Sequence, residues 1–589
     1  IRAGNNITNY ASHIGGFGTT VLHAENDIYV ESVASLYTET YIKKRGFLGL
    51  SGKEIYSESA ILREATVQSG AGDLRVEAGN DISLIGAVIT AAGILDITAG
   101  QDILLDTVAV EGENYAKRKG FSGLSYTSNR RYWNDFYIIQ PEISGYDVNI
   151  TAGRNVAGYA SYIAAFNDLN IIAGTYSEDG TVSQVGDILF DSIQNELYER
   201  ESGFSFGLSF PGSAFLDSII TGQSSESVAK AYLNENPFFS TLYGLSQSDT
   251  GAETALNLIN TATRAVAFGN RIGDSGGFID GIKRELNPFA SLSDAIDGDA
   301  LSDGDLGAFK DLAAVLTVSF STWSNTREWS ESVLSDLSAG RNLSLTSTQD
   351  IQLIGGTQVT TVGDATLRAE RDIILGAAAD WEHSNSSNFG VSLGGNKYGG
   401  FTVGLNASNS NSDADYFTVA GLSVGGHLDI HAGQDMAIIG GIVSAESANI
   451  YVGNDLRVQS LQNTSHSENS NWGVSIDFCP PPTIVCGGSA DAGAGNDDRQ
   501  WTDDVSGIFA ERDLIIEVGN LTQLVGGVLA AGLSEDYIPG DTFLPEGWTS
   551  TPEREDYAFF DNEQEFEAAL ALARARGANP GYGSEGDEE

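Results

Sequence analysis

The feature that most constrains this chain is a repeat of 21 residues in the segment from Asp73 to Leu105. When DLRVEAGNDISLIGAVITAAGILDITAGQDILL is shifted by 21 positions, it lies almost on top of itself. Leu74 falls on Leu95, and the Ala-Gly-x-Asp that begins at Ala78 falls on the one that begins at Ala99. Self-similarity at a short, fixed period predicts a solenoid, in which each coil of the chain stacks on the coil before it.

Within one coil the apolar residues alternate with polar ones. They occupy positions 74, 76 and 78, and then 82 and 84, which is the two-residue period of a strand with one buried face. The Ala-Gly-x-Asp between the two runs is turn chemistry, because Gly tolerates positive φ and an Asp side chain can bond nearby backbone. Each coil is therefore predicted to consist of short strands joined by tight corners.

The same spacing recurs along most of the chain. Gly4 to Ile7 matches Glu25 to Ile28, and Val148 to Gly153 matches Leu169 to Gly174, both at 21 residues. Further along, Ile430 matches Ile450 at 20 residues, and other corners are 22 apart. We therefore predict coils of 20–22 residues up to about residue 532, with Leu, Ile, Val and Ala stacked in the core.

Five segments interrupt the repeat and are predicted to be β-hairpins that leave the coil stack and return. They combine Gly with aromatic or aliphatic residues in strand-like alternation. The excursions are Tyr41–Ser59, Tyr115–Trp133, a third from Glu199 with its return at Leu312–Trp329, a fourth at Asn388–Leu405, and a fifth from Asn471.

The segment between the two arms of the third excursion differs in kind. Thr250 to Glu253 forms a capping box, and the apolar residues that follow have helical spacing. We predict a mostly helical insertion over 211–311. The predicted organisation is then β-helix over 1–210, the insertion over 211–311, β-helix again over 312–532, and an acidic tail or the start of another domain over 533–589.

The charge balance excludes one class of function. Lys and Arg total 31 against 80 Asp and Glu, a net charge of -49, and such a surface repels the phosphate backbone of nucleic acids. The chain has no apolar run of membrane-spanning length. It begins at Ile1 inside a repeat and has a single Met, at position 436, from which we expect a fragment of a longer protein.

No group of residues predicts a catalytic, cofactor or metal site. Acidic residues recur at one corner position in each coil, which indicates a structural role, and their spacing lacks the glycine-rich nonapeptide of calcium-binding β-rolls. These acids are Asp27, Asp81, Asp102, Asp350, Asp372, Asp435, Asp455 and Asp513. His427 and His431 are predicted to be exposed on one strand face with no third metal ligand.

Three further features leave alternatives open. Cys479 and Cys486 can close a small disulfide loop or remain thiols, since sequence does not show their geometry. The run Ala492–Asn496 is predicted to be a loose loop. The basic clusters Lys43–Arg45, Lys117–Lys119 and Arg130–Arg131 are predicted to pair with acids on neighbouring hairpins.

As an alternative to that pairing, the hairpins form an adhesive surface. Their aromatic side chains would then contact a receptor or a glycan, since aromatic residues are favoured anchors in such contacts. The aromatic residues in question are Phe47, Phe121, Phe204, Phe389 and Trp472.

Paired coils of the form Leu-x-Ile-x-Ala-Gly-x-Asp-Ile-x-Leu, interrupted by Gly-Phe-x-x-x-Leu-Ser or Asn-Phe-Gly-Val-Ser, resemble the haemagglutinin repeats of two-partner-secreted exoproteins. That family includes filamentous haemagglutinin adhesins and the effectors of contact-dependent growth inhibition. The resemblance covers about residues 1–532 apart from the insertion. It implies an all-β, right-handed parallel β-helix with protruding hairpins.

The same resemblance implies a function and partners. It implies a monomeric rod exported through an outer-membrane transporter of the two-partner type, at the cell surface or secreted. It also implies a receptor or glycan on a target cell, and a role in adhesion or in carrying a toxin, without catalysis. The alternative is a carbohydrate-active β-helix enzyme, which needs carboxylates gathered on one outer face of neighbouring coils.

Overall fold

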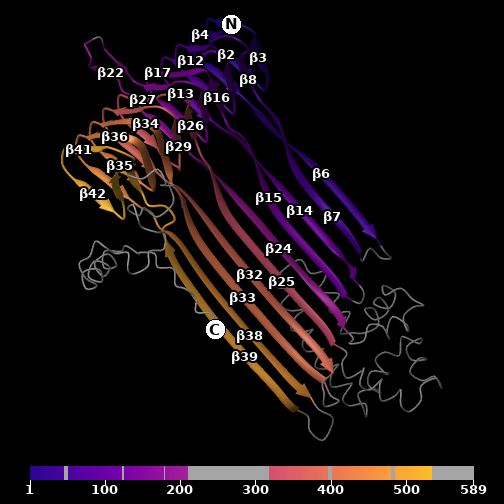
Figure 1. Cartoon of the computed structure of the whole chain (residues 1–589). Helices are drawn as coiled ribbons and strands as arrows, with labels where there is room; N and C mark the ends of the chain where they lie inside the picture. Colours follow the sequence, from indigo (N-terminus) through magenta and orange to yellow (C-terminus); the bar gives the residue numbers. More distant parts are fainter. Residues whose placement is uncertain are drawn as a thin grey trace, which may run out of the picture.

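The computed structural model describes residues 1–45, 51–122, 125–177, 179–209, 317–395, 401–478 and 485–532. These residues form β-strands, turns and bends, with no helix among them. The chain winds into a stack of coils, and a long sheet projects from one corner of the stack (Figure 1). The predicted β-helix is therefore confirmed.

Each coil has three faces, and each face is a ladder of parallel strands. The first face contains β1 (Arg2–Ala3), β4 (Thr20–Ala24), β9 (Leu74–Ala78), β12 (Ile94–Ala99), β17 (Asp147–Ala152), β20 (Leu169–Ala173), β27 (Leu343–Ser347), β30 (Ala365–Ala369), the second halves of β34 (Ala420–Ala432) and β36 (Gly441–Val452), and β41 (Leu514–Val518). A two-stranded excursion, β21 (Thr175–Tyr176) with β22 (Val182–Gln184), leaves this ladder after β20.

The second face is an 11-stranded sheet, so the described residues form eleven coils. It contains β2 (Ile7–Tyr10), β5 (Ile28–Glu31), β10 (Ile82–Ile85), β13 (Ile103–Asp106), β18 (Val156–Tyr159), β23 (Ile188–Asp191), β28 (Ile351–Leu353), β31 (Ile373–Gly376), β35 (Met436–Ile439), β37 (Leu456–Gln459) and β42 (Thr522–Val525).

The third face completes the coil. It contains β3 (His13–Gly16), β8 (Thr66–Ser69), β11 (Val88–Ala91), β16 (Glu142–Gly145), β19 (Tyr162–Ala165), β26 (Asp336–Ala339), β29 (Gln358–Thr361), the first halves of β34 and β36, β40 (Gly507–Ala510) and β43 (Val528–Ala531).

The stacking register is the one that the sequence predicts. Leu95 lies directly against Leu74 on the first face, and Ile430 lies against Ile450. Inward side chains such as Leu74, Leu95 and Ile97 are fully buried. The core is a set of vertical columns, because the alternation of each strand points every second side chain inward and the repeat places like residues above one another.

The corner glycines are needed because neighbouring coils approach closely, and not for the positive φ that the sequence suggests. Gly79 and Gly100 are not among the residues with positive φ. Instead, a Cβ on Gly100 would lie 2.0 Å from the carbonyl oxygen of Gly79, one coil away, and a Cβ on Gly79 would lie 2.0 Å from that of Glu25. Neighbouring coils approach so closely at this corner that no side chain fits.

All five predicted hairpins are present, and each is longer than predicted. The first spans Val33 to Arg63, for example, where the sequence predicts Tyr41–Ser59. The strands are β6 (Val33–Arg45), β7 (Ser51–Arg63), β14 (Val108–Ser122), β15 (Ser125–Ile139), β24 (Ile193–Ser209), β25 (Thr317–Val333), β32 (Ala378–Gly395), β33 (Phe401–Thr418), β38 (Asn463–Phe478) and β39 (Val485–Trp501). In the fourth and fifth hairpins the parts nearer the coils carry Ser and Asn on both sides, as in His383–Asn388 and Asn463–Asn471, which hides their strand pattern in the sequence.

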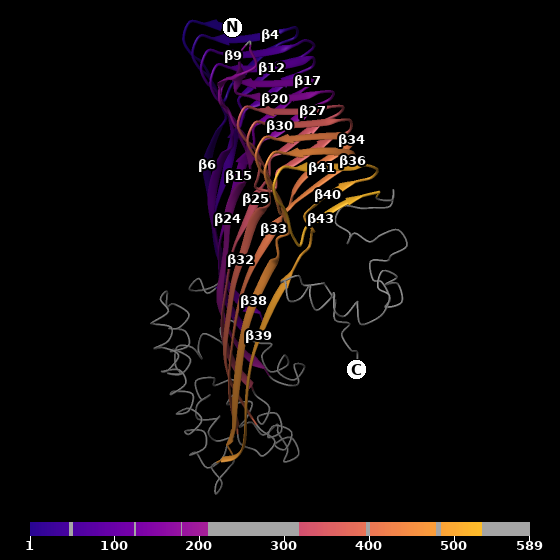
Figure 2. The same cartoon turned by 90° about the vertical axis from the view of Figure 1, so that its left-hand side faces the viewer.

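The hairpins do not project separately: they pair edge to edge into one antiparallel sheet of ten strands, which we call the blade. Neighbouring hairpins join through the pairs β7–β14, β15–β24, β25–β32 and β33–β38. Viewed from its edge in Figure 2, the blade is a single layer of strands. Ala492–Asn496, predicted to be a loop, lies inside β39, so that prediction is wrong.

The blade forms because hairpins leave every second coil, always between the second and third faces. Two coils occupy about 9.6 Å along the axis, and so do the two strands of one hairpin, since both kinds of sheet space strands by about 4.8 Å. Coils without a hairpin turn the same corner through residues of positive φ: Ala11, Gly86, Ala160, the pair Gly355 and Gly356, Gly440, or Gly526. Because coils with a hairpin alternate with coils without one, the blade has close to one strand per coil.

Two predictions fall outside the described residues. The helical insertion over 211–311 and the acidic tail over 533–589 are not described. The cysteine pair is not tested either, because Cys479 and the side chain of Cys486 lie outside the description.

Candidate functional surfaces

The acidic residues at the coil corners are structural, as predicted. The carboxylate of one coil accepts a hydrogen bond from the backbone N–H at the same corner of the next coil. Asp102 N donates to Asp81 Oδ1 at 3.0 Å, and Asp455 N donates to Asp435 Oδ1 at 3.0 Å. Such bonds run from Asn6 to Leu521 through ten side chains: Asn6, Asp27, Asp81, Asp102, Asn155, Asp187, Asp350, Asp372, Asp435 and Asp455.

Asp513 does not belong to this corner ladder, contrary to the prediction. It precedes β41 on the first face, where Leu514 pairs with Ala448, so it lies at the corner between the third and first faces. Asp147, Asp168 and Asp364 occupy that corner in other coils, and they bond the next coil in the same way. The sequence motif is the same at both corners, and only the winding distinguishes them.

At three corners an Arg reaches back to the acid of the preceding coil. The pairs are Arg154 with Asp102, Arg341 with Asp168, and Arg371 with Asp350, each with two hydrogen bonds. The Arg154 guanidinium lowers the pKa of the Asp102 carboxyl, and Arg341 does the same for Asp168. These acids are occupied by the fold and are not free for chemistry.

His427 and His431 do not form a metal pair. His427 bonds Ser447 Oγ through Nδ1 at 2.7 Å. Both histidines are half-buried, where the sequence predicts exposure. The His431 ring stacks on Tyr451 with centroids 4.8 Å apart. Among the described residues no three His, Cys, Asp or Glu side chains come together in a way that could hold a metal ion. Nor do those residues include a helix that could cross a membrane.

The basic clusters of the first two hairpins come together near the far end of the blade. Lys43 pairs across β6–β7 with Lys53, which in turn pairs with Arg118 on β14. All three side chains therefore point to the same side of the sheet. We call these three residues the basic row.

The predicted pairing with acids on a neighbouring hairpin holds at Arg131. Its guanidinium bonds Glu199 of the third hairpin at 2.6 Å and lies over the Trp133 ring at 4.9 Å. Arg327, Glu382 and Trp329 repeat this arrangement further along the blade, with an Arg–Glu distance of 2.7 Å.

Three of the five aromatic residues singled out in the sequence share one row of the blade. Phe204, Phe389 and Trp472 are joined by cross-strand pairs through Thr322 and Ala407. Phe47 and the side chain of Phe121 lie outside the described residues. Cross-strand partners point to the same side of a sheet, so these aromatics form one surface.

The two sides of the blade differ in this far region. A second apolar row lies beside the aromatic one: Phe206, Phe320, Val391, Leu405 and Val474. The row between them, on the opposite side, is small and polar: Ser205, Ser321, Gly390, Asn406 and Gly473. The exposed fraction of the residues in the two apolar rows differs widely: Phe320 is 4% exposed and Trp472 is 43% exposed.

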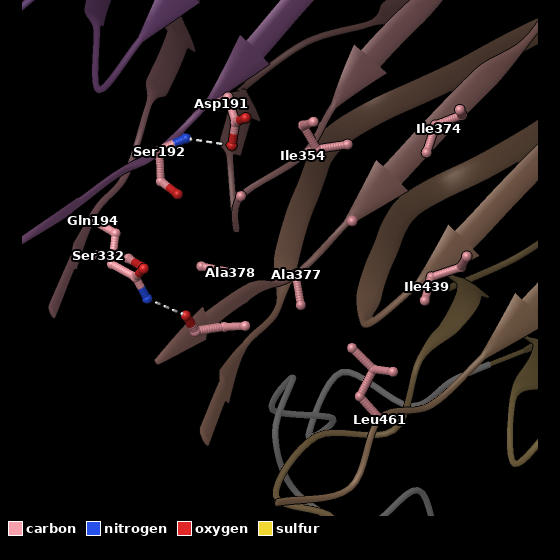
Figure 3. A pocket seen from close by; sticks show the side chains of 13 residues that line it. Asp191, Ser192, Gln194, Ser332, Ile354, Ile374, Ala377, Ala378, Ile439 and Leu461 are labelled. Atoms are coloured by element: carbon pink, nitrogen blue, oxygen red, sulfur yellow. Dashed lines mark hydrogen bonds between the residues drawn. The ribbon is translucent and has the colours of Figure 1, made fainter. Parts of the chain in front are cut away.

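A groove lies in the angle between the blade and the second face of the coils (Figure 3). Its volume is about 470 Å³. Outward-facing Ile354, Ile374 and Ile439 form its floor with Leu461 at one end. Asp191, Gln194 and Ser332, from the third hairpin and the end of β23, form the polar side. We call it the root groove.

The groove's polar groups are held in place by the fold. Gln194 Nε2 donates to the carbonyl oxygen of Ala379 at 2.7 Å, and Ser332 Oγ donates to Asp380 Oδ1 at 2.9 Å. Asp191 Oδ1 accepts from Ser192 N at 2.7 Å. Burial raises the pKa of the Asp191 carboxyl, because loss of solvent disfavours the carboxylate. The sequence reasoning missed this site.

Comparison with known proteins identifies the family of the repeat. The family model described as hemagglutinin repeat matches residues 316–474. They include the returning strand of the third hairpin, the whole fourth hairpin, part of the first strand of the fifth hairpin, and the coils between them. Residues 316–474 are therefore haemagglutinin-repeat sequence, in agreement with the sequence resemblance, and coils and hairpins of the same kind continue on both sides of them.

The chain is similar to curated proteins named CdiA. It is 30% identical to Toxin CdiA of Escherichia coli over 38% of this chain and 8% of that protein. It is 25% identical to the tRNA nuclease CdiA of Yersinia mollaretii over 92% of this chain and 18% of that protein. It is 33% identical to the Deoxyribonuclease CdiA of Yersinia pseudotuberculosis over 35% of this chain and 21% of that protein.

The chain thus spans a small part of these relatives, at most 21% of the length of the three proteins compared above. The family model describes a repeat, and the match lies in coils and blade rather than in any separate catalytic fold. No solved structure matches the chain.

Proposed function

We propose that this chain is a stalk segment of a large exported exoprotein that acts by contact with other cells, and that its part in toxin delivery is mechanical rather than catalytic. The observation that carries the proposal is the alignment of nearly the whole chain with proteins named as toxins and nucleases, of which it covers less than a fifth. Coils and blade account for the described residues, so a toxic activity would reside elsewhere in such a protein.

The proposal includes an export route and a location. A two-partner outer-membrane transporter would pass the chain to the cell surface, where the coils would stack as they emerge. Stacking needs only neighbouring coils, since each strand pairs with the coil before it and the one after. The ranges 1–210 and 312–532 would act as one rod, interrupted by 211–311 and followed by 533–589.

The blade is the part that we propose for contact with a receptor or glycan on the target cell. The basic row supports this, because like charges directly opposite one another in a sheet are destabilising unless an anionic group lies between them. Lys43, Lys53 and Arg118 are in register on a chain whose net charge is -49. An acidic sugar would satisfy all three.

A domain exchange tests the stalk function. This chain would replace the matching region of the Yersinia mollaretii CdiA, and the growth of susceptible cells would be measured beside producers of the chimaera. We expect inhibition close to that by the parent protein. A chimaera that is exported and folded but does not inhibit would contradict the proposal, and binding to cells without inhibition would favour an adhesin.

The contact surface is tested in the same chimaera. Changing Lys43, Lys53 and Arg118 together to Glu should reduce attachment to target cells, counted by fluorescence microscopy. The matched control changes Arg2, Arg75 and Arg457 to Glu, which alters the charge equally but at exposed positions on the coils, outside the corner ladder. Equal loss in the two variants would exclude a specific role for the basic row.

A further inference from the structure

The root groove exists because one hairpin departs from the sequence pattern of the other four. In four hairpins the chain leaves the second face through an acidic or amide residue, a hydroxyl residue and an aliphatic residue: Glu31-Ser32-Val33, Asp106-Thr107-Val108, Asp191-Ser192-Ile193 and Gln459-Ser460-Leu461. The fourth begins with Gly376-Ala377-Ala378. Three small residues replace larger ones, and the space they leave is the groove (Figure 3).

The groove is apolar along most of its length. Its floor follows one outward column of the second face through Ile354, Gly376 and Ile439, on three successive coils. From Asp191 to Ile439 the column rises by three coil spacings, or about 14 Å. A linear aliphatic group fits such a floor, because it can cover the isoleucines without leaving a polar atom unpaired.

The charge at one end of the root groove selects the end group of a bound ligand. Among the described residues that line the groove, Asp191 is the one charged side chain. It lies at one end, beside Gly355, whose missing Cβ lets the carboxylate approach the turn. Oδ1 already accepts the Ser192 N–H. With one carboxylate oxygen engaged, a compact ammonium suits the site better than a guanidinium, which prefers both oxygens.

We propose that the root groove is a binding site for an aliphatic primary amine, with the ammonium on Asp191 and the carbon chain over Ile354, Gly376 and Ile439. The raised pKa of Asp191 agrees with this, since a bound cation would restore the stability that the carboxylate loses on burial. The amine can come from a free amphiphile or from a lysine side chain of a peptide.

Calorimetric titration of the whole chain with three probes of equal length tests the end group. Octylamine should bind, octanol should bind about tenfold more weakly and octanoate more weakly still, in line with the sign of the charge. Equal affinity for octylamine and octanoate, or no binding of octylamine, would overturn the proposal. A Leu-Lys-Leu peptide with blocked ends distinguishes the sources: tighter binding than octylamine would identify a peptide as the source, and weaker binding a free amine.

Two conservative variants locate the site. Asp191→Asn keeps an oxygen for the Ser192 N–H and should lower octylamine affinity about tenfold while leaving octanol binding unchanged. Asp106→Asn is the matched control, because Asp106 precedes the second hairpin and accepts the Thr107 N–H at 2.8 Å in the same way. Equal loss in both variants would show attraction to the acidic surface in general and would overturn the assignment.

A filling variant tests the floor independently of charge. Ala377→Leu introduces a large side chain into the groove at the fourth hairpin and should abolish binding of octylamine and octanol alike. Circular dichroism would verify that the coils remain folded. Undiminished octylamine binding by this folded variant would place the ligand outside the groove.

Discussion

The coil stack and the blade are built on the same strand spacing but are held together differently. In the coils, parallel strands enclose columns of fully buried aliphatic side chains such as Leu95 and Ile97. In the blade, antiparallel strands lie in a single layer, and side chains such as Ile61 remain 49% exposed. The coils are therefore stabilised by burial, and the blade by cross-strand pairing whose register the coils impose.

The largest effect on the register that the coils impose on the blade is expected from removing a single hairpin-free coil. Deleting residues 82–102 joins Asp81 to Ile103 with the corner motif intact, but places the first two hairpins on consecutive coils. These hairpins need about 9.6 Å of separation and would have about 4.8 Å. We expect amide hydrogen exchange to show loss of protection between β7 and β14, with the coils still protected.

Deleting residues 82–155 is the control for that experiment. It removes one hairpin-free coil together with one hairpin coil, and so preserves the alternation. The blade should remain protected in this variant. Loss of protection in both deletions would mean that the blade does not depend on the spacing of the coils.

The next largest effect is expected from truncating a buried side chain, which should destabilise the coils more than the blade. Ile97→Ala removes a fully buried side chain and should lower the free energy of unfolding by about 2–5 kcal/mol. Ile61→Ala on the blade should change it by about 0.5 kcal/mol or less. Urea unfolding followed by circular dichroism measures both free energies. A similar cost at the two positions would mean that burial stabilises the blade as much as the coils.

The corner glycines provide a steric test. Gly100→Ala would place a Cβ 2.0 Å from the Gly79 carbonyl oxygen, and we expect a loss of about 1–3 kcal/mol as the coils are forced apart. At Gly120 in the blade a Cβ would lie 3.3 Å from the Ser51 hydroxyl, its nearest neighbour, so Gly120→Ala should be nearly neutral. Thermal unfolding of the two variants would reveal the difference, and equal melting temperatures would refute it.

The corner acids should make the coils sensitive to acid. Asp102 has a lowered pKa in the folded chain, so its contribution is present above its ordinary value of about 3.9 and is lost as the pH falls through the folded value. Asp102→Ala should cost about 1–3 kcal/mol at pH 7, because Asn155 N–H and Arg154 lose their acceptor. The cost should shrink towards pH 2, and a pH-independent difference would argue against the Arg154 contact as its origin.

The smallest effect is expected at the blade edge, with the opposite sign. His466 on β38 bonds Asp498 of β39 at 2.5 Å, and this contact, with a further one from Glu468, raises the pKa of the imidazole. Its contribution is therefore complete below about pH 6.5 and is lost as the pH rises through the folded value. Amide exchange of β39 should accelerate slightly from pH 6 to pH 8, after correction for intrinsic rates. His466→Gln should remove that dependence.

The sequence alone determined the coils. The 21-residue spacing fixed which residues stack, as Leu74 on Leu95 shows, because a buried column needs like side chains at equal intervals. It also located all five hairpins, since their Gly and aromatic residues interrupt the repeat. It did not distinguish the corner of Asp513 from that of Asp372, because both residues end the same motif, Ala-Glu-Arg-Asp.

Only the tertiary structure decided how the hairpins associate and where the root groove lies. Pairing of β7 with β14 joins residues about 60 positions apart, and it follows from the axial rise of two coils, a distance that no local pattern encodes. The groove likewise needs Asp191, Gly376 and Ile439 on neighbouring coils. The sequence shows which side chains repeat. The distance in space between two repeats exists only after the chain has folded into coils.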